Sequence, residues 1–177
     1  MLSLYDMMMQ AQNGKAVDLM ARQFGLAQEQ AVKAVAALMP AFSEGFKRNA
    51  ANPYDLAAFM KALTTGEHAK YFEDMSKAFT PQGLAEGNGI LGHLLGSKDA
   101  SRAAANAASE QTGLPAQMMK QMLPVVATMV MGALSKQQAS AQQEGGLMGT
   151  LTSLLDSNRD GNVADDVLGL AARFFQK

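Results

Sequence analysis

An acidic segment near the C-terminus carries the residues whose types and spacing best suit metal chemistry. Side-chain oxygens recur at every second position, and Gly161 follows at the sixth position of the segment. This pattern is the first half of a twelve-residue EF-hand calcium loop, in which carboxylate and amide oxygens turn towards one hard cation. The candidate calcium ligands are Asp156, Asn158, Asp160, Asn162, Asp165 and Asp166.

The second half of the loop departs from the calcium-binding pattern. Position twelve, where a bidentate Glu normally completes the coordination, is Val167. Asp165 or Asp166 replaces that Glu only in a contracted loop, so we expect a weak or structural calcium site, with a dissociation constant of about 10⁻⁴–10⁻³ M. A second interpretation stays open, in which the segment is a polar turn and Asn162 or Asp165 caps the next helix.

Residues for catalysis are sparse. The chain has no cysteine and two histidines, His68 and His93, which fall in different predicted helices. No Gly-x-Ser-x-Gly elbow, P-loop or His-Glu-x-x-His helix is present. We therefore predict that the protein is not an enzyme and has no catalytic residues. The alternative, an enzyme with a non-sequential site, requires a pocket that holds one histidine beside a carboxylate.

A glycine motif imitates a dinucleotide site. Gly87, Gly89 and Gly92 match G-x-G-x-x-G, but a dinucleotide site requires a preceding strand, and the residues before Gly87 do not form one. We interpret Gly89, Gly92 and Gly96 instead as a small-residue face that lets a neighbouring helix approach closely.

A second motif imitates a DNA-binding helix-turn-helix. Residues 21–32 place the turn at Gly25, and the helix after it offers Glu29 and Lys33 to DNA. With 15 Lys and Arg against 16 Asp and Glu, the chain lacks the clustered basic excess of nucleic-acid-binding proteins. We expect no nucleic-acid partner, and DNA binding through the hairpin at Gly25 or at Gly113 is the alternative.

The methionines at the N-terminus suggest a different kind of partner. Met7, Met8 and Met9 are adjacent, so on a helix they point in different directions and do not all face one core. Methionine-rich surfaces suit adaptable protein contacts. We therefore expect a non-catalytic interaction protein, which binds a protein partner or a second copy of itself through the Met-rich N-terminal helix.

Several stretches resemble one bacterial family. The segment 87–98 is similar to the signature stretch of the bacterial family named domain of unknown function 937, which includes the YidB-like proteins. Further similar stretches are 111–114, 120–125, 129–134 and the closing segment 154–171. The resemblance implies a multihelical bacterial protein. This family has no established activity, so the resemblance assigns no role to any residue.

The elements that must position these residues are predicted to be helices throughout. Ala, Leu, Met and Gln are frequent, aromatic residues make up 6% of the chain, and Trp is absent. We predict an all-α fold, a multihelical bundle of helical hairpins with a small C-terminal helix–loop–helix tail. Thr80-Pro81 predicts a short turn, and Pro40 a kink or a break. The predicted helices cover 2–12, 16–24, 28–50, 54–63, 67–78, 87–97, 99–111, 115–143, 147–155 and 167–176.

The chain divides into two parts by composition. Residues 1–143 are expected to form the multihelical domain, with a further division into 1–80 and 81–143 left open, and residues 144–177 form the tail. The N-terminus lacks the basic and apolar regions of a signal peptide. The most apolar run, 122–134, is shorter than the ~20 residues of a membrane span. We expect a buried core helix there, no transmembrane segment, and a cytoplasmic protein.

Overall fold

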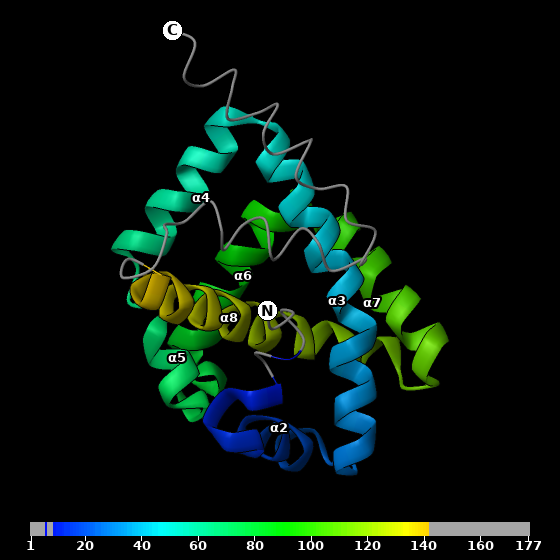
Figure 1. Cartoon of the computed structure of the whole chain (residues 1–177). Coiled ribbons are helices and arrows are strands. Elements are labelled where there is room, and N and C mark those ends of the chain that lie inside the picture. The colour runs from blue at the N-terminus through cyan, green and yellow to red at the C-terminus, as the bar shows by residue number, and fades with distance from the viewer. Residues whose placement is uncertain (1–5, 7–8, 142–177) are drawn as a thin grey trace, which may run out of the picture.

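The computed structural model describes residue 6 and residues 9–141, and these residues form an all-α bundle (Figure 1). No strand occurs among them. The predicted fold class is therefore confirmed for the described part of the chain. The predicted tail, 144–177, lies outside the described residues.

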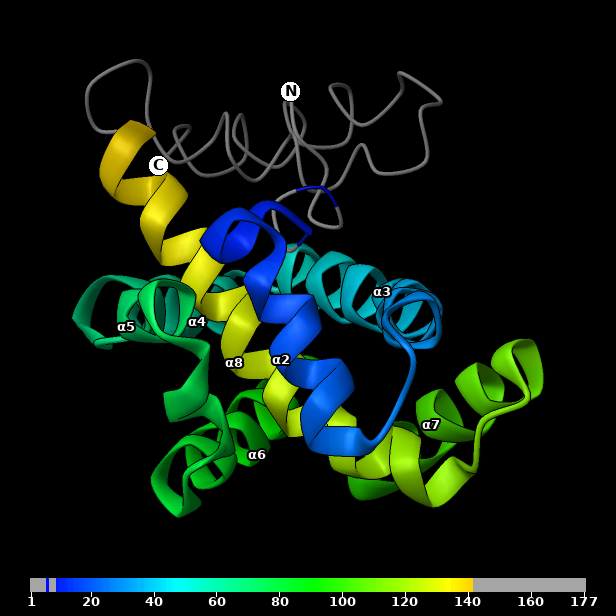
Figure 2. The same cartoon turned by 90° about the horizontal axis from the view of Figure 1, so that it is seen from below.

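Helix α8 (Ala116–Ala141) runs through the middle of the bundle, between α3 (Gln28–Ala51) and α6 (Pro81–Leu95), as Figures 1 and 2 show. Every residue from 122 to 134 is buried. A helix that is apolar all round must be covered on all sides, and the other helices provide that cover. The predicted core helix is thus confirmed.

The apolar stretch of α8 is longer than the run 122–134 that the sequence prediction used. Within α8, Ala116–Lys136 is long and apolar enough to cross a membrane, with a mean hydropathy of 1.2. Length therefore does not distinguish this helix from a membrane span, because the residues that flank 122–134 extend the stretch. In this bundle 78% of the stretch is buried, which is typical of a core helix.

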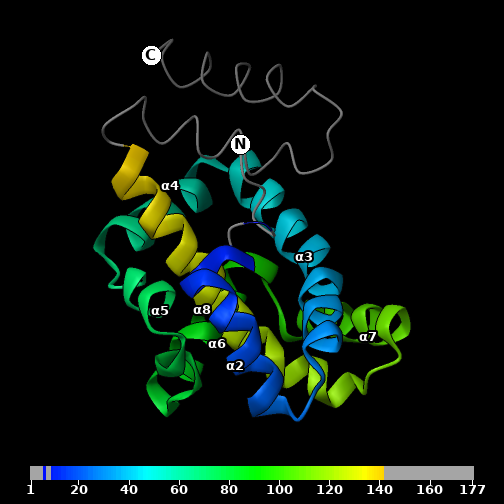
Figure 3. The same ribbon diagram turned by 60° about the horizontal axis from the view of Figure 1, so that its bottom comes forward.

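The first hairpin follows the predicted boundaries closely. A 3₁₀ turn (Ala11–Gly14) leads into α2 (Lys15–Phe24), which ends at Gly25, and α3 begins at Gln28. Figure 3 shows α2 and α3 side by side, joined by this short turn. Pro40 does not divide α3, which continues through it to Ala51.

The connection from α3 to α4 (Pro53–Thr65) is a capped helix start, next to residue 54, where the predicted helix begins. The side chain of Asn52 accepts a hydrogen bond of 3.0 Å from the backbone N–H of Tyr54, and Pro53 occupies the first helical position. Both residues favour a helix start, because Asn satisfies a free N–H group and Pro has none to satisfy.

The predicted helix over 67–78 is wrong in one respect. The structure has two short helices, α5 (Ala69–Glu73) and the 3₁₀ helix η2 (Met75–Phe79). Asp74 lies between them in an extended conformation, and its carboxylate accepts a hydrogen bond of 3.1 Å from the N–H of Ser76. A capping Asp therefore ends one helix and begins the next.

The predicted turn at Thr80-Pro81 is the start of α6. The hydroxyl of Thr80 accepts a hydrogen bond of 3.1 Å from the N–H of Gly83, and Pro81 occupies the first helical position. The glycines that follow do not interrupt α6. Helix α7 (Lys98–Thr112) comes next and leads into α8.

One core unites helices from both halves of the sequence. Phe42 and Leu38 of α3, Tyr71 of α5 and Leu94 of α6 are buried in the same cluster as the apolar side chains of α8. Each fully buried side chain of this size stabilises the fold by roughly 1.5–3 kcal/mol. Helices α6 and α7 pack against α8 in this core. These three helices also form a pocket.

Candidate functional site

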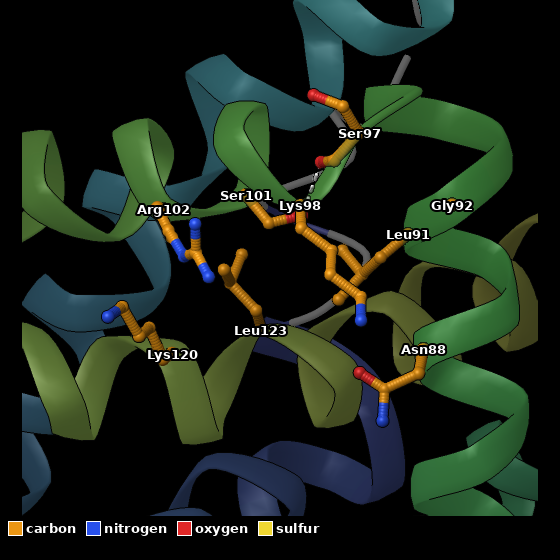
Figure 4. Close-up of a pocket in the computed structure, with 9 residues that line it drawn as sticks. All are labelled: Asn88, Leu91, Gly92, Ser97, Lys98, Ser101, Arg102, Lys120 and Leu123. Carbon is orange, nitrogen blue, oxygen red and sulfur yellow. Dashed lines mark hydrogen bonds between the residues drawn. The ribbon is translucent and has the colours of Figure 1, made fainter.

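A basic pocket lies where α6, α7 and the first half of α8 meet (Figure 4). Its volume is about 570 Å³, which is within the range of sites for small organic ligands. Three elements contribute to its wall. The lining residues are Asn88, Leu91 and Gly92 of α6, Ser97, Lys98, Ser101 and Arg102 at the start of α7, and Lys120 and Leu123 of α8.

Two glycine turns bring these three helices together. Gly96 (φ 78°) ends α6 and Gly113 (φ 72°) ends α7, both in the left-handed conformation that glycine adopts without a steric penalty. Ser97 then caps α7, because its hydroxyl oxygen accepts a 3.1 Å hydrogen bond from the N–H of Ala100. The turn at Gly113 returns the chain, so that Lys120 of α8 lies across from α7 (Figure 4).

The pocket carries a net positive charge. Arg102 Nη1 lies 2.9 Å from Asp99 Oδ1, one turn away on α7, and this ion pair is largely exposed to solvent. Among the described residues, no carboxylate lies within 4.0 Å of the amino group of Lys98 or Lys120. The local excess of cations occurs in a chain whose formal net charge is −1.

Neutral polar groups complete the rim of the pocket. Asn88 is exposed on α6, and the hydroxyl of Ser97 retains its own proton for a further hydrogen bond. The hydroxyl of Ser101 donates to the backbone carbonyl of Ser97 at 3.3 Å. The lining contains no imidazole or carboxylate that could activate these hydroxyls. The arrangement can therefore bind an anion, but it presents no activated nucleophile.

The floor of the pocket is apolar. Leu91 and Leu123 belong to the core, with 5% and 1% of their surface exposed, and both line the pocket, Leu123 between Lys98 and Arg102 (Figure 4). Gly92 adds no side chain, and a Cβ atom at this position would meet nothing within 4 Å. The wall of the pocket is therefore open at Gly92.

The predicted calcium loop cannot be placed in this structure. The residues that could bind calcium all lie outside the described part of the chain, and calcium binding stays a prediction. They are Asp156, Asn158, Asp160, Asn162, Asp165 and Asp166. In residues 9–141, no group of three or more His, Asp or Glu side chains could hold a metal ion.

The Met-rich N-terminus is described only in part. Met7 and Met8 lie outside the described residues, whereas Met9 is partly buried and packs on a small apolar cluster of Val17, Ala21 and Ala31. Met9 therefore takes part in packing within the chain.

The two histidines lie in different environments. His93 is exposed on α6, whereas the side chain of His68 is 13% exposed, and its Nδ1 lies 3.9 Å from Glu86 Oε2 without a hydrogen-bond partner. Lys70 Nζ lies 3.6 Å from Glu86 Oε1, and the same carboxylate acts on the Tyr71 hydroxyl. We call His68, Lys70, Tyr71 and Glu86 the His68 cluster.

Burial dominates the protonation of the His68 cluster. It lowers the pKa of His68, and the opposite effect of the Glu86 carboxylate is smaller. Burial raises the pKa of Tyr71 far above its usual value, and the Glu86 carboxylate adds to this effect. The enzyme alternative requires a histidine beside a carboxylate within a pocket. The structure brings His68 and Glu86 together, but neither lines the basic pocket.

The prediction for the glycines of α6 was wrong. Gly89 and Gly92 are exposed and would meet nothing within 4 Å, and Gly96 is the residue that ends the helix. The close approaches occur instead at Gly83 and Gly87, where an added Cβ would overlap the backbone of neighbouring segments. Buried residues recur along α6 at 83, 87, 90, 91, 94 and 95, so the other glycines point outwards.

The helix-turn-helix motif at Gly25 shows no free cationic face. Arg22 Nη2 lies 2.8 Å from Asp18 Oδ2, and Lys33 Nζ lies 2.9 Å from Glu29 Oε1. Each cation is paired with a carboxylate one turn away on its own helix. The hairpin at Gly113 differs, because its two helices carry the cations of the basic pocket.

Sequence reasoning missed the basic pocket for a geometric reason. Lys98 and Arg102 are one helical turn apart on α7, and this spacing is visible in the sequence. Lys120 follows 18 residues after Arg102, and only the turn at Gly113 and the packing of α7 on α8 bring it to the same cavity. The predicted hairpin at Gly113 was the sequence signal that could have placed Lys120 near Lys98 and Arg102.

Comparison with known proteins identifies a family and no characterised relative. Neither the curated proteins nor the solved structures include a match to the chain. One family model, described as bacterial protein of unknown function (DUF937), matches residues 6–137. These residues make up about three quarters of the chain. They include α6, α7 and the part of α8 up to residue 137, which together form the basic pocket. The chain therefore belongs to this bacterial family of unknown function.

Proposed function

We propose that the protein is a non-catalytic binding protein whose ligand carries an anionic group that the basic pocket holds. The observation that supports this proposal most directly is the position of Lys98 and Lys120. They line one cavity from different helices, and no described carboxylate pairs with either. An anion that enters the pocket is attracted by the positive charges of both lysines.

The composition of the lining favours binding over catalysis. Ser97 and Ser101 are the hydroxyl groups of the pocket, and both already take part in hydrogen bonds at the start of α7. The His68 cluster contains the imidazole and carboxylate of an acid–base pair, but its residues do not reach this cavity. The pocket therefore supports recognition of an oxyanion, with lysines as charged donors.

The same observations support DNA binding less well. A DNA-binding surface needs cations spread along a phosphate backbone. Here three cations line one pocket, and Asp99 partly neutralises Arg102. A small anionic group fits this arrangement better than an extended duplex does.

Calorimetric titration of the whole chain with inorganic phosphate at low ionic strength tests the proposal. Lys98→Gln and Lys120→Gln should each weaken binding roughly fivefold, because two unit charges 4 Å apart in water interact by about 1 kcal/mol. The matched control is Lys61→Gln, which removes one exposed lysine of α4 that does not line the pocket. This control should leave the affinity unchanged.

Two results of this titration would contradict the proposal. The first is no heat of binding for the wild-type protein at millimolar phosphate. The second is equal weakening by all three substitutions, which would show a general charge effect. A duplex DNA titration that saturates and depends on Lys98 and Lys120 would favour the DNA-binding alternative.

A further inference from the structure

We infer that the ligand of the basic pocket is an amphiphilic organic anion, an oxyanion headgroup joined to a short apolar chain. This inference rests on the proposed function, because it adds an apolar subsite to the same anion site. Two features of the pocket carry it, its volume and its apolar floor.

The volume of the pocket exceeds what a bare oxyanion needs. A pocket of about 570 Å³ is many times larger than the ~30 Å³ that one water molecule takes up in the liquid. Inorganic phosphate has five non-hydrogen atoms and would fill a minor part of this space. The remaining space suits the organic part of a ligand.

The chemistry of the floor indicates what that organic part is. Leu123 lies between Lys98 and Arg102, and Leu91 lies beside Lys98 on the α6 side of the pocket (Figure 4). The methylene stems of the lysine and arginine side chains extend this apolar surface towards the charged rim. A headgroup at Lys98 therefore leaves room for an attached chain over Leu91 and Leu123, where its burial is favourable.

The open position of Gly92 allows a test that leaves the cations and the core intact. Gly92 lines the pocket, lies within α6, and would have no atom within 4 Å of an added Cβ. Leucine at this position adds an apolar side chain to the wall of the pocket. Gly89 is the matched control, since it is equally open, lies on the same helix and does not line the pocket.

The experiment compares inorganic phosphate, methyl phosphate and hexyl phosphate as calorimetric ligands for the full chain. Hexyl phosphate should bind the wild type at least about tenfold more tightly than methyl phosphate, the factor expected from burying two methylene groups. Gly92→Leu should abolish this gain. Gly89→Leu should preserve it.

The outcomes separate this inference from the proposed function. If phosphate binds through Lys98 and Lys120 but hexyl phosphate gains nothing over methyl phosphate, the apolar subsite is refuted and the anion site stands. If the gain persists in Gly92→Leu, the chain of the ligand lies elsewhere and the subsite is again refuted. If inorganic phosphate does not bind at all, the proposed function itself fails.

Discussion

Gly87 of α6 lies directly against the backbone carbonyl of Pro124 of α8, so that a Cβ atom on Gly87 would overlap that oxygen. The backbones of the two helices are in close contact at this crossing. The same crossing sets the separation between the two walls of the basic pocket, because Asn88 follows Gly87 and Leu123 precedes Pro124. The geometry of the site therefore depends on a residue that has no side chain.

This relationship predicts opposite effects for two glycine substitutions only two residues apart. Gly87→Ala should destabilise the fold by about 1–3 kcal/mol, because the added methyl group meets backbone atoms that cannot turn away. Gly89→Ala should stabilise it by up to about 1 kcal/mol, because alanine is the better helix former and the position is open. Urea unfolding followed by circular dichroism measures both changes. Equal effects of the two substitutions would contradict the assigned contact.

The end of α6 is held by α3 and gives a second prediction. Arg48 Nη2 donates hydrogen bonds of 3.1 Å to the carbonyl of Leu94 and 2.8 Å to that of Leu95. These carbonyls have no partner within their own helix, because they belong to its last turn.

Arg48→Met keeps the length of the side chain and removes its hydrogen-bond donors. We expect the free energy of unfolding to fall by about 1–2 kcal/mol. This value is towards the low end for charged hydrogen bonds, because Arg48 is exposed. Lys61→Met, on the exposed face of α4, is the control and should change the free energy of unfolding by less than about 0.5 kcal/mol. Thermal and urea unfolding of both variants measure the difference. A loss of similar size in both variants would argue against the cap.

The buried histidine predicts a dependence of stability on pH. Burial lowers the pKa of His68 in the folded protein below the ordinary value of 6.5. Below pH 6.5 the unfolded chain therefore binds a proton more readily than the folded chain does, and the free energy of unfolding falls as the pH decreases. The stabilising contribution is complete above pH 6.5 and is lost as the pH falls towards the pKa of the folded state.

His68→Gln should remove this component of the acid dependence, and His93→Gln, which replaces the exposed histidine of α6, should retain it. Urea unfolding between pH 7.5 and 5 measures the free energy of unfolding of the wild type and of both variants. An identical decline in the wild type and in His68→Gln would show that His68 does not contribute.

The acidic C-terminal segment gives a prediction that depends on sequence alone. Calcium at millimolar concentration should shift the amide resonance of Gly161 in EDTA-treated protein, and Asp160→Ala should abolish the shift. Asp55→Ala, which removes an exposed carboxylate of α4, is the control and should leave it unchanged. A spectrum without calcium-dependent shifts would favour the interpretation as a capped polar turn.

Much of the fold was predictable because local chemistry marks the helix ends. Asn52-Pro53, Gly25 and Gly113 marked boundaries that the structure confirms within two residues. The same cap chemistry at Thr80-Pro81 predicted only a short turn, whereas it begins α6. Glycine has a low helix propensity, but tertiary packing offsets it here, since Gly83 and Gly87 are the residues that let α6 approach its neighbours.

The candidate site was not predictable to the same degree. Its cations come from two helices, and their common cavity depends on the crossing of α6 and α8 and on the turn at Gly113. Neither the helix crossing nor the effect of the turn can be derived from the spacing of residues within one helix. The glycines of α6 illustrate the same limit, because composition identifies small residues but only packing decides which of them face a neighbour.

The most direct test of the anion site is a map of phosphate binding by amide NMR on the wild-type chain. We predict saturable shifts that are largest for the amides of Asn88, Lys98, Ser101 and Lys120, and that weaken as sodium chloride screens the lysines. Shifts that never saturate, or that centre on residues outside α6, α7 and the first half of α8, would contradict the assignment of the pocket as the binding site.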